Sequence, residues 1–144
     1  MKYLFAVCLL CLPFSQAYAH CQIPCGIYDD ARVFDELEEH IATIERSMQA
    51  IEESKNTHDI ARWVLNKEEH AQKIQDIVAQ YFLTQRLKIN DENYVQSLMR
   101  IHQLSLFAMK AKQTTDLEVV RDLKETLTGY EKLYFMPHEH EEKE

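Results

Sequence analysis

Apolar side chains recur every three or four residues through most of the chain after residue 29, and this spacing places them on one face of an α-helix. The pattern predicts helices over about 30–54, 57–86, 90–112 and 115–136. Four amphipathic helices with short connections favour an all-α fold, an antiparallel up-down four-helix bundle. The expected core residues, in chain order, are Phe34, Leu37, Ile41, Ile44, Met48, Ile51, Ile60, Ala61, Val64, Leu65, Ala71, Ile74, Val78, Tyr81, Phe82, Tyr94, Leu98, Ile101, Leu104, Ser105, Ala108, Ala111, Leu117, Val120, Leu123, Leu127, Tyr130 and Tyr134.

Polar residues mark the expected starts of these helices. We expect Asp30 or its neighbour Asp29 to cap the first helix, Thr57 the second and Asn90 the third. Thr115 begins a Thr-x-x-Glu capping box for the fourth. Only two Gly and three Pro occur in 144 residues, so few helix breakers interrupt the pattern.

The first nineteen residues follow a different pattern. Lys2 precedes an apolar run over 4–12 that is too short to span a membrane, and the segment ends in Ala-Tyr-Ala, a small-x-small site for signal peptidase. The pattern predicts a secretory signal peptide that a leader-processing peptidase removes after Ala19. The mature protein is then exported, either periplasmic or secreted, and has no membrane association after processing.

The net charge and the cysteine content limit the partners and the cysteine chemistry that can be expected of the mature protein. The formal charge is −8, and loss of the leader with Lys2 lowers it to −9. An acidic protein has no general attraction for nucleic acid or anionic membranes, so neither is expected as a partner. Of the four cysteines, Cys8 and Cys11 lie in the leader, so the mature chain keeps only Cys21 and Cys25.

The residues just after the expected cleavage site, 20–28, concentrate metal ligands. Cleavage makes His20 the N-terminus and supplies an α-amine beside an imidazole, a backbone amide and two thiols. The amine, the Cys21 amide nitrogen and the Cys21 thiolate can close two five-membered chelate rings, and Cys25 can supply a fourth ligand. Two nitrogens and two sulfurs in a plane suit Ni(II) or Cu(II), whereas Zn(II) prefers a tetrahedron. A disulfide between the two cysteines is the alternative, which export would favour.

This stretch resembles the metal-binding hook of the nickel superoxide dismutases. The mature N-terminus of that family reads His-Cys-x-x-Pro-Cys-Gly-x-Tyr, and this chain matches it at His20, Cys21, Pro24, Cys25, Gly26 and Tyr28. The resemblance implies a nickel ion bound by the amine and imidazole of His20, the amide and thiolate of Cys21, and the thiolate of Cys25. It also implies a cis peptide bond before Pro24.

The function that the resemblance implies is the disproportionation of superoxide into dioxygen and hydrogen peroxide. Nickel would cycle between Ni(II) and Ni(III) and would be the only cofactor. The family's four-helix bundles assemble as homohexamers with the hooks at subunit contacts, so a homohexamer is expected here. An exported nickel or copper carrier without turnover is the alternative function, and an exported helical adaptor with a disulfide is a third.

Further site residues follow from the same resemblance. Tyr28 matches a catalytic tyrosine that closes over the metal, with a buried aromatic packed on the hook as the alternative. Tyr81 resembles a second site tyrosine. Gln22 stands where some members have Asp, and it keeps a hydrogen-bonding side chain without the charge.

In the family, a glutamate early in the first helix hydrogen-bonds the histidine ring. Glu36 occupies that position when residues are counted from His20 without gaps, and Glu39 is a competitor. A solvated carboxylate is the alternative for each. His70 stands where some members have Arg, and we interpret it as a helix-surface histidine, with hydrogen-bond donation near the site as the alternative.

The predicted organisation has four parts. They are a signal peptide over 1–19, a nickel hook over 20–28, a four-helix bundle over 29–137 and a disordered acidic tail over 138–144. The tail holds His138 and His140, which could bind metal, but its charged composition favours disorder.

Overall fold

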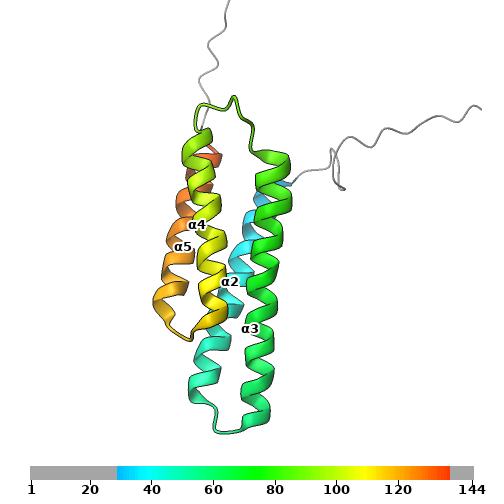
Figure 1. Ribbon diagram of the computed structural model, residues 1–144, viewed down its shortest axis with the longest axis vertical. Helices are drawn as coiled ribbons and strands as arrows, with labels where there is room; N and C mark the ends of the chain where they lie inside the picture. Colours follow the sequence, from blue (N-terminus) through cyan, green and yellow to red (C-terminus); the bar gives the residue numbers. More distant parts are fainter. Residues whose placement is uncertain (1–28, 137–144) are drawn as a thin grey trace, which may run out of the picture.

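The computed structural model describes residues 29–136. It contains helices α2 (Asp30–Glu53), α3 (Thr57–Ile77) with its continuation η2 (Val78–Arg86), α4 (Tyr94–Gln113) and α5 (Leu117–Tyr134). The helices run alternately up and down (Figure 1), and both α2 and α4 pack against α3 and α5. The prediction of an all-α, antiparallel four-helix bundle is confirmed. Within the described range, no helix is long and apolar enough to cross a membrane.

The core of the bundle is made by the apolar stripes. The aliphatic side chains of Leu37, Ile44 and Leu123 are fully buried, as is the ring of Phe82. Burying each such side chain contributes about 1.5–3 kcal/mol. The expected core residues that are buried are Phe34, Leu37, Ile41, Ile44, Met48, Ala71, Ile74, Val78, Phe82, Ile101, Leu104, Ala108, Ala111, Val120, Leu123, Leu127 and Tyr130.

The lower end of the bundle, at the connection between α2 and α3, departs from the prediction. There α2 and α3 extend past the turn between α4 and α5 (Figure 1). The first turns of α3 therefore lack two of the helices that would cover them, and Val64 and Leu65 are 36% and 69% exposed. Ala61 is also exposed and Ile60 is half-buried. The placement of these four residues in the core was wrong, because periodicity gives the face of a helix but not the length of its neighbours.

A buried lysine marks the level at which α4 ends. Lys67 is 3% exposed, and its Nζ donates to the carbonyl oxygens of Ala111 at 2.6 Å, Lys112 at 2.7 Å and Thr114 at 3.1 Å. The last carbonyls of a helix have no partner within the helix and carry partial negative charge, so a cation there is stabilising. Lys67 thus caps α4 from a neighbouring helix. Glu68 is not in the core, and its carboxylate lies 3.5 Å from the Lys67 ammonium.

The first helix cap follows the prediction, and the second does not. Asp29 caps α2 by accepting a hydrogen bond from the Arg32 amide at 3.1 Å. Asn56, rather than Thr57, caps α3 by accepting from the His58 amide at 3.0 Å. The prediction for Thr57 was therefore wrong by one residue.

The caps of the last two helices also differ from the prediction. Helix α4 begins at Tyr94 with Asn93 as its cap residue, so the assignment of Asn90 was wrong. Asp116 caps α5 by accepting from the Glu118 amide at 2.9 Å, which leaves the Thr115 hydroxyl to donate to Glu52 at 2.5 Å. The capping box was wrong because the carboxylate one residue later reaches the orphan amide instead.

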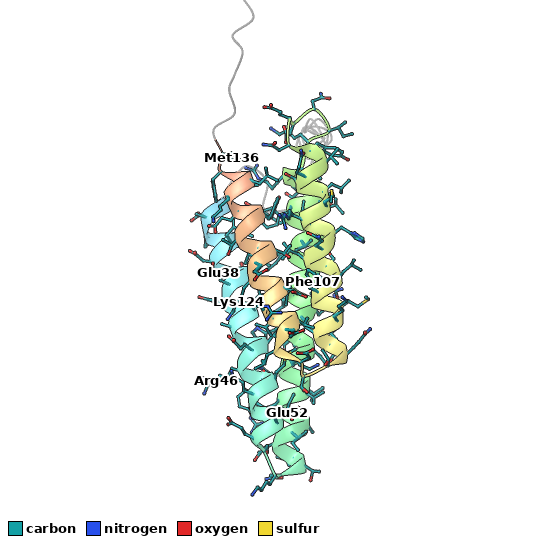
Figure 2. The ribbon with its side chains drawn as sticks, turned by 90° about the vertical axis from the view of Figure 1, so that its left-hand side faces the viewer. Glu38, Arg46, Glu52, Phe107, Lys124 and Met136 are labelled. Carbon is teal, nitrogen blue, oxygen red and sulfur yellow. The ribbon has the colours of Figure 1, made fainter. Side chains whose placement is uncertain are left out.

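Contacts between α2 and α5 close the bundle. Figure 2 shows Glu38, Arg46 and Glu52 along α2 with Lys124 of α5 beside that helix. The Lys124 ammonium binds the Glu45 carboxylate at 2.7 Å, and both side chains are partly exposed. Exposed ion pairs of this kind contribute about 0–1 kcal/mol, so packing rather than charge holds the two helices together.

Candidate functional site

The upper end of the bundle, where α2 begins and α5 ends, is the part of the structure that follows the hook sequence. The predicted signal peptide, hook and tail lie outside the described residues, and with them His20, Cys21, Gln22, Cys25 and Tyr28. Chain geometry still restricts the hook, because an extended chain spans at most about 3.6 Å per residue. The five-residue step from Cys25 to the first residue of α2 can therefore span at most about 18 Å.

Four polar side chains meet at this upper end. The Asp30 carboxylate, at the start of α2, accepts hydrogen bonds from the Tyr81 hydroxyl, the Arg86 guanidinium and, at 2.7 Å, the Tyr134 hydroxyl. Arg86 also donates through Nε to the Tyr134 oxygen at 2.9 Å. These residues, the Asp30 cluster, join α2, η2 and α5. The Asp30 side chain is only 18% exposed.

The π-helical geometry of η2 explains how two of its side chains reach one carboxylate. Tyr81 and Arg86 are five residues apart, and in an α-helix they would point about 140° away from each other. The wider π turn, with bonds between residues five apart, brings them toward the same side. The Leu87 amide shows this spacing by donating to the Phe82 carbonyl at 2.8 Å. Short π segments occur frequently at functional sites.

Aromatic rings border the Asp30 cluster on the core side. The ring of Phe34 lies 5.0 Å from that of Phe82, 5.6 Å from that of Tyr130 and 5.4 Å from that of Tyr134 between centroids. Their tilted and edge-to-face arrangements are favourable for aromatic pairs. The apolar wall excludes water from one side of the charged groups and so strengthens the hydrogen bonds between them.

Contacts within the Asp30 cluster shift the pKa values of its members. Burial alone would raise the pKa of Asp30, but hydrogen bonds from Tyr81, Tyr134 and Arg86 outweigh it and hold that pKa below its usual range. Burial, together with donation to Asp30, raises the pKa of Tyr134 to about 12 and that of Tyr81 still further. Asp30 is therefore ionised and both phenols are protonated at neutral pH. An ionised carboxylate has only acceptors, so both hydroxyls donate to it.

A cavity of about 570 Å³ opens beside the cluster. Asp30, Arg86 and Tyr134 form part of its wall, and residues of the connection between η2 and α4 form much of the rest. The cluster is thus packed against the core on one side and faces a solvent-accessible space on the other.

A second polar pair lies between α2 and α3. The Nδ1 atoms of His40 and His70 are 3.1 Å apart, and His40 is 9% exposed. Burial and repulsion from the neighbouring ring lower the pKa of His40, although Glu36 and Glu39 act in the opposite direction. Burial and then Lys73 lower the pKa of His70. The interpretation of His70 as a surface histidine was wrong, because it is half-buried against a ring on the next helix.

Comparison with protein-family models matches residues 15–137 to the nickel-containing superoxide dismutases. The matched range includes the hook motif and all of the described bundle. The chain belongs to this family. It is therefore a nickel-dependent superoxide dismutase, an oxidoreductase whose substrate is superoxide and whose cofactor is nickel. Comparisons with curated proteins and with solved structures gave no match.

The donor groups of the hook sequence can be compared with what nickel requires. Among residues 29–136 no group of three or more His, Cys, Asp and Glu side chains is placed to hold a metal ion. The amine, imidazole, amide and thiols at 20–25 are the soft and borderline donors that suit nickel. The donor chemistry of this sequence therefore fits the cofactor of the family.

The predicted partners of the hook in the bundle lie at different distances from the start of α2. Tyr81 belongs to the Asp30 cluster, at the end from which the hook extends. Glu36 is about 9 Å farther along α2 and Glu39 about 14 Å, at 1.5 Å per residue. The Glu36 carboxylate is 39% exposed and binds Arg32 at 3.2 Å, whereas Glu39 is exposed. Glu36 is therefore the nearer of the two carboxylates to the start of α2.

Sequence reasoning missed the residues that organise this end. Asp30 was considered only as a helix cap, and Arg86 and His40 were not considered. A partial signal existed, because Asp30 is only the second residue after the hook and Asp29 can serve as the cap. The partners of Asp30 lie 51 to 104 residues away in the chain, and His70 lies 30 residues from His40, so local patterns could not pair them.

Proposed function

We propose that the nickel ion of this dismutase is held at the mature N-terminus that cleavage after Ala19 creates. The ligands are the amine and imidazole of His20, the amide nitrogen and thiolate of Cys21, and the thiolate of Cys25. The observation that carries the proposal is the hook motif directly after a signal-peptidase site, inside the range that matches the family. A leader still attached to His20 would leave no free amine.

The chain's own residues then have distinct tasks. Nickel, when bound, would supply the one-electron redox couple that disproportionation of superoxide requires. The thiolates of Cys21 and Cys25, with the deprotonated amide, donate electron density to nickel. This donation brings the reduction potential of the nickel couple into the range that reaction with superoxide requires. The His20 imidazole would stabilise the oxidised state of nickel, and Tyr28 would shield the ion. Two protons enter the reaction for each peroxide formed.

The groups around the hook orient and protect it. We assign Glu36 to the His20 ring, since it is nearer the start of α2 than Glu39, and we assign Tyr81 and Gln22 to hydrogen bonding at the site. Thiolates near a metal that forms peroxide are susceptible to oxidation. The groups around them therefore determine how long the enzyme stays active. Hydrogen bonds that orient metal ligands are worth about 10–100-fold in affinity or activity.

We also propose an exported homohexamer, either periplasmic or secreted. Exposed apolar side chains support assembly, since contiguous patches of this kind mark interaction sites. On α4, Val95 is 61% and Met99 59% exposed, and Leu83 of η2 is 44% exposed. Leu83 and Met99 line an apolar groove of about 440 Å³.

The direct experiment compares the mature protein with His20→Ala. Wild type should bind nickel, accelerate superoxide decay and give a Ni(III) spin-resonance signal with nitrogen coupling from the imidazole. His20→Ala keeps the amine, the amide and both thiolates, so it should bind nickel but turn over far more slowly and lose the nitrogen coupling. A wild-type protein that binds nickel but shows neither signal nor decay above free metal would be a carrier. Equal activity of the two proteins would refute the role given to the imidazole.

A further inference from the structure

We propose that Asp30 is a positioning residue for the dismutation reaction, because it anchors the base of the hook on the bundle and fixes the direction of the Tyr81 hydroxyl. The inference rests on the proposed function, in which nickel is bound in the hook. Asp30 touches neither metal nor substrate in this account and acts through Tyr81 and through the chain that leads to the hook.

The first support is the convergence of the cluster on one carboxylate. Donors from η2 and α5 bind the two oxygens of Asp30, so the start of α2 is tied to segments from the middle and the end of the chain. Charge-assisted hydrogen bonds are the stronger kind, and three of them meet here. Asp29 is held as well, by the Arg32 amide. Both residues between the hook and the body of α2 therefore have their carboxylates engaged.

The second support is the short distance along the chain. Tyr28 precedes Asp30 by two residues and lies within about 7 Å of it along the backbone, and Cys25 lies within about 18 Å. Fixing Asp30 thus fixes the origin from which the hook can extend. A reacting centre placed even about 1 Å away from its productive position can lose 10²-fold in rate.

The third support is the hydrogen-bonding direction at Tyr81. Its hydroxyl has one hydrogen, and this hydrogen points to an ionised carboxylate that cannot donate in return. Any other group that hydrogen-bonds the Tyr81 oxygen must therefore donate to it. Superoxide is an anion with acceptors only, so Tyr81 orders a donor such as water rather than binding superoxide directly.

The alternative is that the Asp30 cluster only stabilises the bundle. A change at Asp30 would then lower the thermal stability but would not alter the behaviour of nickel that remains bound. The test therefore measures nickel release and the rate per bound nickel separately from unfolding. The variants are Asp30→Asn, which keeps the size but removes the charge, and Asp30→Glu, which restores it. Asp35→Asn is the matched control, because Asp35 is an exposed carboxylate on the same helix.

We expect Asp30→Asn to keep its helix content by circular dichroism and to release nickel to EDTA faster. Its rate of superoxide decay per bound nickel should fall by about 10–100-fold, the range found for groups that orient metal sites. Asp30→Glu should recover part of the loss, and Asp35→Asn should match wild type. Wild-type release and wild-type rate per nickel in Asp30→Asn, whatever its melting temperature, would overturn the inference.

A double-mutant cycle provides the second measurement. If Asp30 acts on the rate through Tyr81, then Asp30→Asn combined with Tyr81→Phe should be no slower than the slower single variant. If the double variant instead loses rate by the product of the two single effects, Asp30 does not act through Tyr81. If Asp30→Asn does not fold, Tyr134→Phe can replace it, because this variant removes one donor to Asp30 and keeps the ring. Nickel release at the wild-type rate in Tyr134→Phe would then refute the proposal that Asp30 anchors the hook. Absence of nickel and activity in wild type would refute the proposed function, and this inference with it.

Discussion

The two ends of the bundle are built in opposite ways. At the upper end, three segments of the chain meet, polar groups are largely removed from water, and each hydrogen bond of the Asp30 cluster joins elements distant in sequence. At the lower end, only α2 and α3 continue, and apolar side chains such as Leu65 are exposed. The contrast shows that the end of the bundle next to the hook sequence is closed by a polar cluster from three helical segments, whereas two helices continue alone at the opposite end. The opposite end depends on local helix structure and on Lys67.

The largest expected effect is a loss of nickel and activity, caused by changes in the hook that leave the bundle folded. Cys21→Ser and Cys25→Ser should each abolish nickel loading and superoxide decay, because two thiolates are needed to bring the nickel couple into range. Helix content and melting temperature of the metal-free proteins should stay close to wild type, since neither cysteine is in the described core. Nickel analysis, circular dichroism and superoxide decay would be compared. Unchanged activity would reject the ligand assignment, and loss of the fold would favour a structural disulfide.

The second effect concerns stability at the end of α4. Lys67→Met keeps most of the side-chain length but removes the donor to three carbonyls, so unfolding should become easier by about 1–3 kcal/mol. The rate of superoxide decay per bound nickel should not change, because Lys67 is far from Asp30 along the bundle. Thermal melting would measure the loss. Lys73→Met is the control, since Lys73 forms a partly exposed ion pair with Glu69 and should lose about 0–1 kcal/mol. Equal effects of the two variants would show that the cap is unimportant.

The third effect is a dependence of stability on pH. The pKa values of His40 and His70 are lowered from 6.5 in the folded protein, so the folded state binds fewer protons than the unfolded state. Their contribution is complete above pH 6.5 and is lost as the pH falls through the lowered values. His40→Gln should flatten the decrease of melting temperature with acid in that range. His102→Gln, at an exposed position of α4, should keep the wild-type slope. A slope unchanged in His40→Gln would show that other groups cause the acid sensitivity.

The smallest effect is expected at the exposed lower end. Leu65→Gln should change the free energy of unfolding by no more than about 0.5 kcal/mol, as for most surface positions. Ile74→Ala, at a fully buried position of the same helix, should cost about 2–5 kcal/mol. Chemical denaturation of both variants would test the difference. A large loss in Leu65→Gln, together with a smaller assembly in solution, would show that a neighbouring subunit covers this end.

The sequence predicted most of the fold because its main signal is local. Apolar periodicity assigned Leu37, Ile44 and Leu123 to the core correctly, since the repeat of an α-helix fixes which residues share a face. The same signal failed for Leu65, because the helices that would cover it end earlier. Cap positions were displaced by one to three residues, and at the start of α5 the reason is that Asp116 binds the Glu118 amide which the Thr115 capping box would have used.

The candidate site was predictable only in part. His20, Cys21 and Cys25 are adjacent in sequence, so their chemistry could be inferred from spacing and from the resemblance to a family. Asp30 and Arg86 acquire their roles from partners on other helices, which no local pattern identifies. A π turn also changes which residues share a face, and this change placed Tyr81 and Arg86 together.

The central claim is that nickel is bound at an N-terminus beginning with His20. The most direct measurement compares two proteins, one starting at His20 and one that keeps Ala19 in front of it. The extra residue turns the His20 amine into an amide and changes nothing in the bundle. We predict that the protein starting at His20 binds nickel and disproportionates superoxide, while the extended protein folds equally well but does neither. Nickel binding and full activity in the extended protein would contradict the account.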